Sequence, residues 1–202
     1  MSIIARNYFN IPFEDRKKIK VLDLGCGGGN NAKYFAENGF NYYGIDGSSS
    51  AIKVCKNRFK KWNLKGNFVQ GDFLELPYED NCFDLIVDRE STYANKLKDL
   101  NKIIEQIHKK LKKNGLYLSF TYSSQHQSKE FGEILEPNTY YKFNDKSCFH
   151  KTGIVHFIDI KEIIKVYSKF KIQNIMRHSL YEIYNQSSKL MEYDEYIIIA
   201  RR

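Results

Sequence analysis

Three glycines and an acidic residue near the start of the sequence could bind a nucleotide-like ligand. The glycines occupy alternate positions, Gly25, Gly27 and Gly29. Glycine permits backbone angles that other side chains forbid, so a ligand can approach the main chain closely. Asp23 precedes the first glycine by two residues, and its carboxylate would attract an ammonium group, directly or through water. The motif therefore favours a ligand with a cationic group over a ligand with a pyrophosphate.

The spacing of these glycines differs from the dinucleotide fingerprint. That fingerprint is Gly-x-Gly-x-x-Gly, and Asn30 occupies the position of its third glycine. S-adenosylmethionine (SAM) carries an ammonium group and no pyrophosphate. Asp23-x-Gly25-x-Gly27-x-Gly29 resembles motif I of the class I SAM-dependent methyltransferases. An NAD(P)-linked oxidoreductase is the alternative that this acidic residue argues against.

A second acidic residue ends the next predicted strand. Residues 42–45 form a short run with strand character, and Asp46 and Gly47 follow it. Asp46 lies about twenty residues after the glycine turn, where a carboxylate at the end of the neighbouring strand accepts hydrogen bonds from ribose hydroxyls. The alternative is that Asp46 only caps the next helix, but the serines at 48–50 are available for that task. We expect Asp46 to bind ribose and Gly47, beside it, to lie in the cofactor site.

The resemblance assigns three further cofactor residues. In the methyltransferase family, an acidic residue after the third strand accepts a hydrogen bond from the adenine amino group, and the next residue contacts the base. Asp72 and Phe73 occupy those positions. Residues 81–88 resemble the fourth strand of the family, and the resemblance places Asp88, at its end, in the cofactor site. The implied cofactor is SAM, with S-adenosylhomocysteine as its product.

The residues after the fourth strand lie over the reactive methyl group in this family. Here they are Arg89 and Glu90, followed by Ser91, and they include neither proline nor cysteine. The stretch thus lacks the Asp/Asn-Pro-Pro-aromatic motif of amino-methylating DNA enzymes and the Pro-Cys nucleophile of cytosine C5 enzymes. Arg89 and Glu90 either face the substrate or pair with each other, and the sequence leaves both possibilities open.

The regular alternation of strands and helices breaks between Tyr122 and His156. In the family that the sequence resembles, an insertion after the fifth strand commonly forms the acceptor pocket, so we expect that pocket at about 123–156, with Tyr122 as a substrate contact. Histidine is the usual general base near neutral pH. His126 and His156 are therefore the candidate catalytic residues, although each could be an ordinary hydrogen-bonded histidine. Their spacing, with His150 between them, predicts no metal site.

Hydrophobic periodicity predicts the remaining elements. We expect one Rossmann-like α/β domain over 1–202, with a mostly parallel seven-stranded sheet, an antiparallel last strand and helices on both faces. Asn114 and Gly115 should end the third of the long helices, and Tyr8 and Phe9 should pack on the sheet or close over the cofactor. The predicted strands are 21–24, 42–45, 67–70, 81–88, 116–121, 170–178 and 193–201, and the predicted helices are 31–38, 49–61, 97–113 and 159–169.

Composition restricts the class of protein and its partners. The 202 residues are 42% hydrophobic, with no apolar run near the roughly 18 residues that a membrane span needs and no secretory signal at the start. Four widely spaced cysteines indicate reduced thiols in a cytoplasmic protein. The net charge of +8 suggests nucleic acid, but the densest basic cluster, 108–113, lies at a predicted helix end, where cations favour the dipole. Nucleic acid is therefore not the expected partner.

These observations predict a SAM-dependent methyltransferase. We expect it to methylate an oxygen or nitrogen of a small-molecule or glycan acceptor. The alternatives are a nucleic-acid methyltransferase and a SAM-binding protein without catalysis. The tyrosine-rich N-terminus and insertion could form a lid or the contact of a homodimer.

Overall fold

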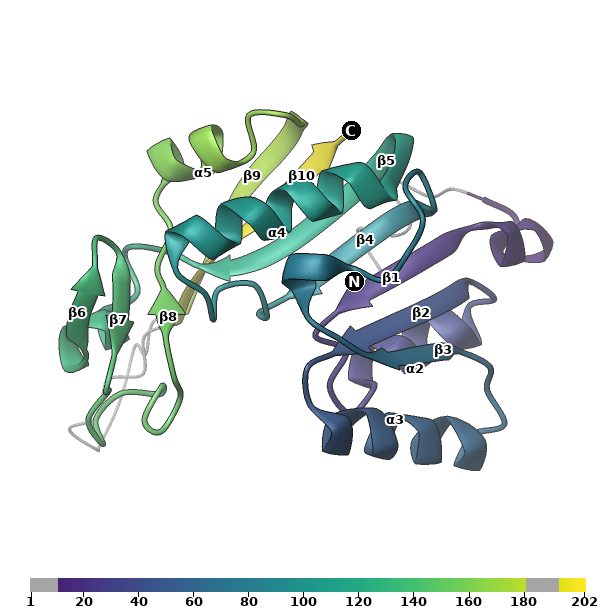
Figure 1. Ribbon diagram of the computed structural model, residues 1–202, viewed down its shortest axis with the longest axis horizontal. Helices are drawn as coiled ribbons and strands as arrows, with labels where there is room; N and C mark the ends of the chain where they lie inside the picture. Colours follow the sequence, from purple (N-terminus) through teal and green to yellow (C-terminus); the bar gives the residue numbers. More distant parts are fainter. Residues whose placement is uncertain (1–10, 181–192) are drawn as a thin grey trace.

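The computed structural model describes residues 11–180 and 193–202, and a seven-stranded sheet lies at its centre (Figure 1). The strand order is β3-β2-β1-β4-β5-β10-β9, and only β10 runs antiparallel to its neighbours. This arrangement confirms the predicted mostly parallel sheet. The strands are β1 (Lys20–Leu24), β2 (Asn41–Asp46), β3 (Asn67–Gln70), β4 (Phe83–Arg89), β5 (Leu111–Tyr122), β9 (Lys171–Leu180) and β10 (Tyr193–Arg201).

The strand order reverses between β1 and β4. From β1 the chain proceeds through β2 to β3 on one side, and it returns through β4 and β5 on the other. The two central strands pair directly, with Leu24 opposite Asp88. In open α/β sheets, ligands bind outside the carboxyl ends of the strands at such a reversal. The topology therefore points to the loops that follow β1, β2, β3 and β4.

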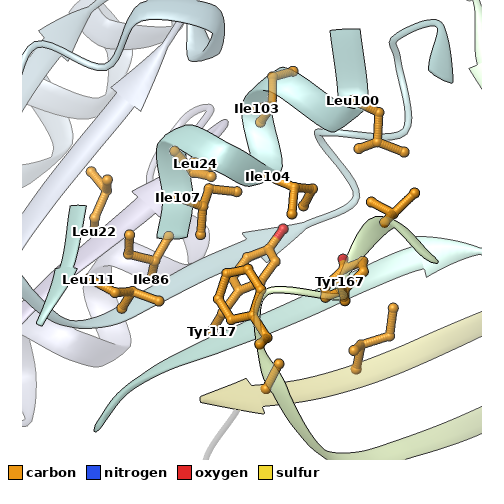
Figure 2. Close-up of a cluster of buried hydrophobic side chains, with 14 of the residues drawn as sticks. Leu22, Leu24, Ile86, Leu100, Ile103, Ile104, Ile107, Leu111, Tyr117 and Tyr167 are labelled. Atoms are coloured by element: carbon orange, nitrogen blue, oxygen red, sulfur yellow. The ribbon is translucent and has the colours of Figure 1, made fainter. Parts of the chain in front are cut away.

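Helices cover both faces of the sheet. The helices α2 (Asn30–Glu37) and α3 (Ser49–Lys61) share one core cluster with the sheet, and α4 (Leu97–Lys110) and α5 (Ile160–Val166) share another. Figure 2 shows the second cluster, in which side chains of α4 lie against the strands. The buried residues of α4 follow helical spacing, since they are Leu100, Ile103, Ile104 and Ile107. Burial of each such side chain stabilises the fold by about 1.5–3 kcal/mol.

The largest difference from the predicted elements lies at the end of α4. The helix ends at Lys110, three residues before the predicted end, because Leu111 already pairs with Phe83 as part of β5. The register of this pairing shifts before Leu116. Asn114 lies in the shifted stretch with a φ of 63°, so it marks a turn, as its type predicts, but the turn interrupts a strand and does not cap the helix.

Several other segments end at residues different from those predicted, or lie partly outside the described residues. A short 3₁₀ helix, η1 (Phe13–Lys18), precedes β1, and the predictions for Tyr8 and Phe9 lie outside the described residues. The strand β9 continues to Leu180, two residues beyond its predicted end at 178, and residues 181–192 lie outside the described residues. No helix in the described ranges is long and apolar enough to cross a membrane.

The insertion after β5 forms a small sheet of its own. It contains η3 (Gln127–Phe131), β6 (Glu133–Glu136), β7 (Thr139–Tyr141) and β8 (Val155–His156). Figure 1 shows this sheet beyond the end of β5, on the side where the arrows of the central strands point. Two backbone hydrogen bonds attach it there, from His156 to the carbonyl of Tyr93 and from Ser124 to the carbonyl of Ile158, both 2.9 Å long. The insertion is therefore next to the ligand edge of the main sheet.

Candidate ligand-binding site

The glycine turn after β1 has no room for side chains at two of its positions. Gly25 has a φ of 67°, and a Cβ built on it would lie 2.4 Å from the Cβ of Ser91. Gly29, the N-cap of α2, has a φ of 87°, and its Cβ would lie 2.6 Å from the Sγ of Cys55. The backbone of Gly27 is also in the left-handed region, but the space beside this residue is open. A ligand can therefore approach the main chain at the centre of this turn.

Asp46 holds the glycine turn from the end of β2. Its Oδ2 accepts a hydrogen bond from the backbone N–H of Gly27 at 2.9 Å, and its Oδ1 accepts one from Ser48 at 2.8 Å. The cap of α3 is Ser48, whose hydroxyl accepts from the N–H of Ala51. The alternative of a helix-capping Asp46 is therefore wrong, while ribose binding by this half-exposed carboxylate stays a prediction.

Asp23 is a buried carboxylate with one unsatisfied oxygen. Its Oδ2 accepts from the hydroxyl of Tyr42 at 2.8 Å, while its Oδ1 has no hydrogen-bond partner among the described residues. Burial raises the pKa of Asp23 to about 7, and the carboxylates of Asp88 and Asp46 act in the same direction. An unpaired buried acceptor is costly. This oxygen is therefore suited to a ligand that carries a cationic or hydrogen-bond-donating group.

A cleft of about 540 Å³ lies at the carboxyl ends of β2, β3 and β4. Gly47, Asp72 and Phe73, three of the predicted ligand residues, line one side of it. Asp72 begins the short helix η2 (Phe73–Glu75), because its Oδ1 accepts from the N–H of Leu74 at 2.9 Å. The residues that line the cleft are Gly47, Gln70, Gly71, Asp72, Phe73, Ser91, Ala94 and Asn95.

Five of these lining residues were not candidates in the sequence. Gln70 and Gly71 lie at the end of β3, and Ser91, Ala94 and Asn95 belong to the loop between β4 and α4, which places Ser91 beside β1. The hydroxyl of Ser91 donates to the carbonyl of Leu24 at 2.6 Å. The signal that could have identified this loop is its position at the strand reversal, since no residue type in it is distinctive.

Asp88 anchors the same loop and has no free face for a ligand. Its fully buried carboxylate accepts from the N–H and hydroxyl groups of Ser91 and Thr92 and from the hydroxyl of Ser119. Burial raises the pKa of Asp88, and these hydrogen bonds oppose the change. The predicted direct contact between Asp88 and the cofactor is therefore unsupported, and its hydrogen bonds position Ser91 instead.

Arg89 and Glu90 have separate partners. Arg89 is exposed, donates to the Oδ1 of Asn31 at 3.4 Å and lies 6.0 Å from the ring of Phe120. Glu90 accepts from the hydroxyl of Tyr122 at 2.9 Å and from that of Tyr193 at 2.7 Å. Of the two possibilities left open by the sequence, the mutual ion pair is thus wrong.

His126 lies in an aromatic cluster next to Tyr122. Its Nδ1 accepts from the N–H of Ser128 at 3.2 Å, while its Nε2 is buried without a partner among the described residues. Burial lowers the pKa of His126 to about 4, so the ring is neutral at pH 7. The ring centroids of Phe149 and Tyr122 are 5.2 and 5.4 Å away. The accepting role of Nδ1 implies that Nε2 carries the proton.

His156 is held within the small sheet. Its Nδ1 lies 2.7 Å from the hydroxyl of Thr139, and its Nε2 lies 3.0 Å from the carboxylate of Glu162. Both ring nitrogens of this buried residue are therefore occupied. The prediction that His156 takes a proton from an acceptor has no support in this geometry, because either nitrogen would first have to lose a hydrogen bond.

Known proteins with similar sequences and folds include several methyltransferases. A family model described as a methyltransferase domain matches residues 15–189. The sterol 24-C-methyltransferase of Schizosaccharomyces pombe is 37% identical over 101 residues, which cover 48% of this chain and 26% of that protein. This chain thus spans about a quarter of the length of the sterol methyltransferases that it matches.

Two solved structures share the fold over nearly the whole chain. A SAM-dependent methyltransferase from Methanosarcina mazei has a TM-score of 0.80 at 19% identity, and the match covers 98% of this chain and 96% of that one. The 1,6-didemethyltoxoflavin N1-methyltransferase of Burkholderia thailandensis has a TM-score of 0.70 at 18% identity, with coverage of 100% and 76%. The latter structure contains 1,6-didemethyltoxoflavin and S-adenosylhomocysteine.

Proposed function

This chain belongs to the class I SAM-dependent methyltransferases, and we propose that it methylates an oxygen or nitrogen of a small-molecule or glycan acceptor. The observation that carries the proposal is the unsatisfied Oδ1 of Asp23 beside the open glycine turn. Bound SAM supplies a methyl group on a positively charged sulfonium, which is intrinsically electrophilic. The main task of the protein is then to align donor and acceptor.

The residues that line the cleft and those of the adjacent glycine turn suit SAM. We assign the free oxygen of Asp23 to the ammonium group of the cofactor and the carboxylate of Asp46 to its ribose hydroxyls. We assign Asp72 and Phe73 to the adenine. The left-handed turn at Gly25 and Gly27 supports this arrangement, because it leaves the main chain open to the ligand.

We assign the acceptor side to Glu90, Tyr122 and the insertion. The raised pKa of Tyr122, which results from burial and the nearby Glu90 carboxylate, keeps its phenol protonated as a hydrogen-bond donor. His126 presents Nε2 as a donor, so we give it an orienting role, and a role as general base would require the other tautomer. We omit His156 because both of its ring nitrogens are bound.

Several whole-protein features belong to the same proposal. We propose that residues 1–202 act as a single domain, that the enzyme works in the cytoplasm, and that a homodimer is compatible with its surfaces. Nucleic acid is the alternative acceptor, and a SAM-binding protein without catalysis is the alternative function. A non-catalytic protein would bind SAM but have no binding site for an acceptor.

Calorimetric titration with SAM, S-adenosylhomocysteine and NAD tests the cofactor assignment. We expect micromolar binding of the first two ligands and none of NAD. Asp46→Ala should weaken SAM binding at least about tenfold, because it removes the ribose acceptor and a hydrogen bond to Gly27. Asp80→Ala is the matched control, since Asp80 is exposed and pairs only with Lys110 on the surface. Binding of NAD alone would overturn the proposal.

A further inference from the structure

The loop after β4 places the carboxylate of Glu90 within a group of tyrosine side chains. We propose that the acceptor is an amine that binds as an ammonium cation, and that Glu90 and the rings of Tyr93, Tyr122 and Tyr193 recognise it. Because the cation has no lone pair, its nitrogen gives one proton to the Glu90 carboxylate before it takes the methyl group, and S-adenosylhomocysteine is the leaving group. This inference rests on the proposed methyltransferase function and names the acceptor class of that site. Recognition of an ammonium group by one carboxylate and several aromatic rings uses two attractions that a neutral hydroxyl acceptor does not receive.

Glu90 lies immediately beside the cofactor cleft. It follows the end of β4, and its neighbour Ser91 lines the cleft and donates to the carbonyl of Leu24. Ala94 of the same loop also lines the cleft, while Tyr93 between them contacts the ring of Tyr122. One short loop therefore contributes residues both to the cleft and to the tyrosine group, which is the arrangement that a donor and an acceptor require.

The backbone of Glu90 adopts an unfavourable conformation. Its φ of 56° lies in the left-handed region, which a non-glycine residue rarely adopts and which is found more often at functional sites. The hydroxyls of Tyr122 and Tyr193 hold the side chain, with one bond to each carboxylate oxygen. A carboxylate accepts about four hydrogen bonds, so both oxygens keep acceptor capacity for a ligand.

Glu90 differs from the acidic residues near it in its lack of a basic partner within the described part of the chain. Over the described ranges, Glu90 forms no ion pair. The neighbouring acidic residues do, since Asp194 pairs with Arg177 at 2.7 Å and Glu195 lies 3.0 Å from His178. His126 adds no charge, because burial keeps it neutral. An ammonium ligand would complement this carboxylate, whereas a carboxylate or phosphate ligand would be repelled by it.

Aromatic rings pack around Tyr122, whose hydroxyl binds the carboxylate of Glu90. The ring centroid of Tyr122 lies 4.7 Å from those of Tyr93 and Phe149 and 5.9 Å from that of Tyr193. Aromatic faces attract cations within about 6 Å. Tyr93, Tyr193 and Glu90 are half-buried, so part of the group is accessible from the surface. The unpartnered Nε2 of His126, in contact with Tyr122 and Tyr193, provides a donor for a second polar atom.

Ligand-observed saturation-transfer NMR with two matched probes tests this inference without turnover. Benzylamine is an ammonium ion at pH 7, and benzyl alcohol is its uncharged counterpart. Each is titrated into the full-length protein saturated with S-adenosylhomocysteine. We expect benzylammonium to bind at least about tenfold more tightly than benzyl alcohol. Equal affinity of the two probes, or binding of neither, would contradict the inference.

Two variants identify the residue responsible for this preference. Glu90→Gln keeps the shape and the hydrogen-bond acceptor but removes the charge, so the preference for benzylammonium should fall to about threefold or less. Glu130→Gln, an exposed glutamate of η3, should keep the preference of the parent protein. An unchanged preference in Glu90→Gln would refute the assignment to Glu90. Calorimetric binding of S-adenosylhomocysteine checks that each variant is folded, and its failure in the parent protein would refute the proposed function itself.

Discussion

Asp23 carries its carboxylate into the interior of the sheet, where one oxygen accepts from Tyr42 and the other has no partner among the described residues. Burial raises its pKa from an ordinary value of 3.8 to about 7. Because the folded-state pKa is above the unfolded-state pKa, the associated stability is fully present below about pH 4 and is lost as the pH rises through about 7. The ionised form that suits a cationic cofactor is thus the form that destabilises the ligand-free protein.

We therefore expect Asp23→Asn to stabilise the ligand-free protein and to weaken SAM binding. At pH 8 we expect the ligand-free variant to be more stable than the parent protein by about 2–4 kcal/mol. At pH 4 or below this difference should largely vanish, because Asp23 is then mostly protonated in the unfolded chain as well as in the folded one. SAM binding should weaken at least about tenfold. Urea unfolding at both pH values measures the stability difference, and Asp145→Asn, an exposed change, serves as control. A stability difference that is the same at both pH values would contradict the pKa argument.

Local geometry was predictable where it depends on one short stretch of sequence. The left-handed glycine turn follows Asp23 as expected, while the role of these residues in cofactor binding stays a prediction. The roles expected for Asp88 and His156 have no support in their hydrogen bonds, which residue type alone did not indicate. His156 lies between Thr139 and Glu162, and nothing in the spacing of these residues predicts that both ring nitrogens are occupied.

Elements were predicted closely where one periodic pattern determined them. The helix over 49–61 and the strand over 67–70 have their predicted bounds. The end of α4 was not predictable in this way, because the residues up to Lys113 continue a helical pattern. The helix stops at Lys110 since Leu111 joins the sheet beside Phe83. This helix boundary depends on the pairing of Leu111 with a distant strand, and local helix propensity does not predict it.

Packing of α4 on the sheet predicts that two isoleucine substitutions have very different effects on the stability of the protein. Ile107 is fully buried in the cluster drawn in Figure 2, whereas Ile164 of α5 is 58% exposed. Ile107→Ala should lower the free energy of unfolding by about 2–5 kcal/mol through lost burial and a residual cavity. The same change at Ile164 should alter it by no more than about 0.5 kcal/mol. Chemical denaturation monitored by circular dichroism compares them, and similar losses at the two positions would contradict the observed packing.

At the scale of the whole molecule, the topology gathers distant segments at one edge of the sheet. The mostly parallel sheet with its antiparallel last strand was expected from the resemblance to a family, and the observed strand order brings the residues around 23, 46, 72 and 91 to that edge. The tyrosine group was not expected as a unit, although Glu90 and Tyr122 were separate candidates. Tyr193 reaches Glu90 from 103 positions away, because β10 inserts beside β5, and no motif in the sequence links these two residues.

The same topology separates the basic cluster from the cofactor cleft. The C-terminal end of α4 and the start of β5 lie at the amino end of β4, since Leu111 pairs with Phe83. The cleft lies at the opposite, carboxyl end of that strand. Two lysines of the cluster also have acidic partners, with Lys110 bound to Asp80 and Lys112 to Asp84, both at 2.8 Å. The cluster would therefore hold a nucleic acid at the edge opposite the cofactor cleft.

We accordingly expect only weak, nonspecific binding of nucleic acid. A DNA duplex of about 20 base pairs should bind with a dissociation constant no lower than about 1 µM near 150 mM salt, and its affinity should fall steeply as salt increases. Removing the two exposed lysines of the cluster, with Lys109→Ala and Lys113→Ala, should weaken this binding further and leave the affinity for S-adenosylhomocysteine unchanged. Fluorescence anisotropy at several salt concentrations measures the affinity for DNA, and calorimetry measures the affinity for S-adenosylhomocysteine. Nanomolar, salt-resistant binding of DNA would instead favour a nucleic-acid acceptor, because charge on the remote edge alone cannot produce it.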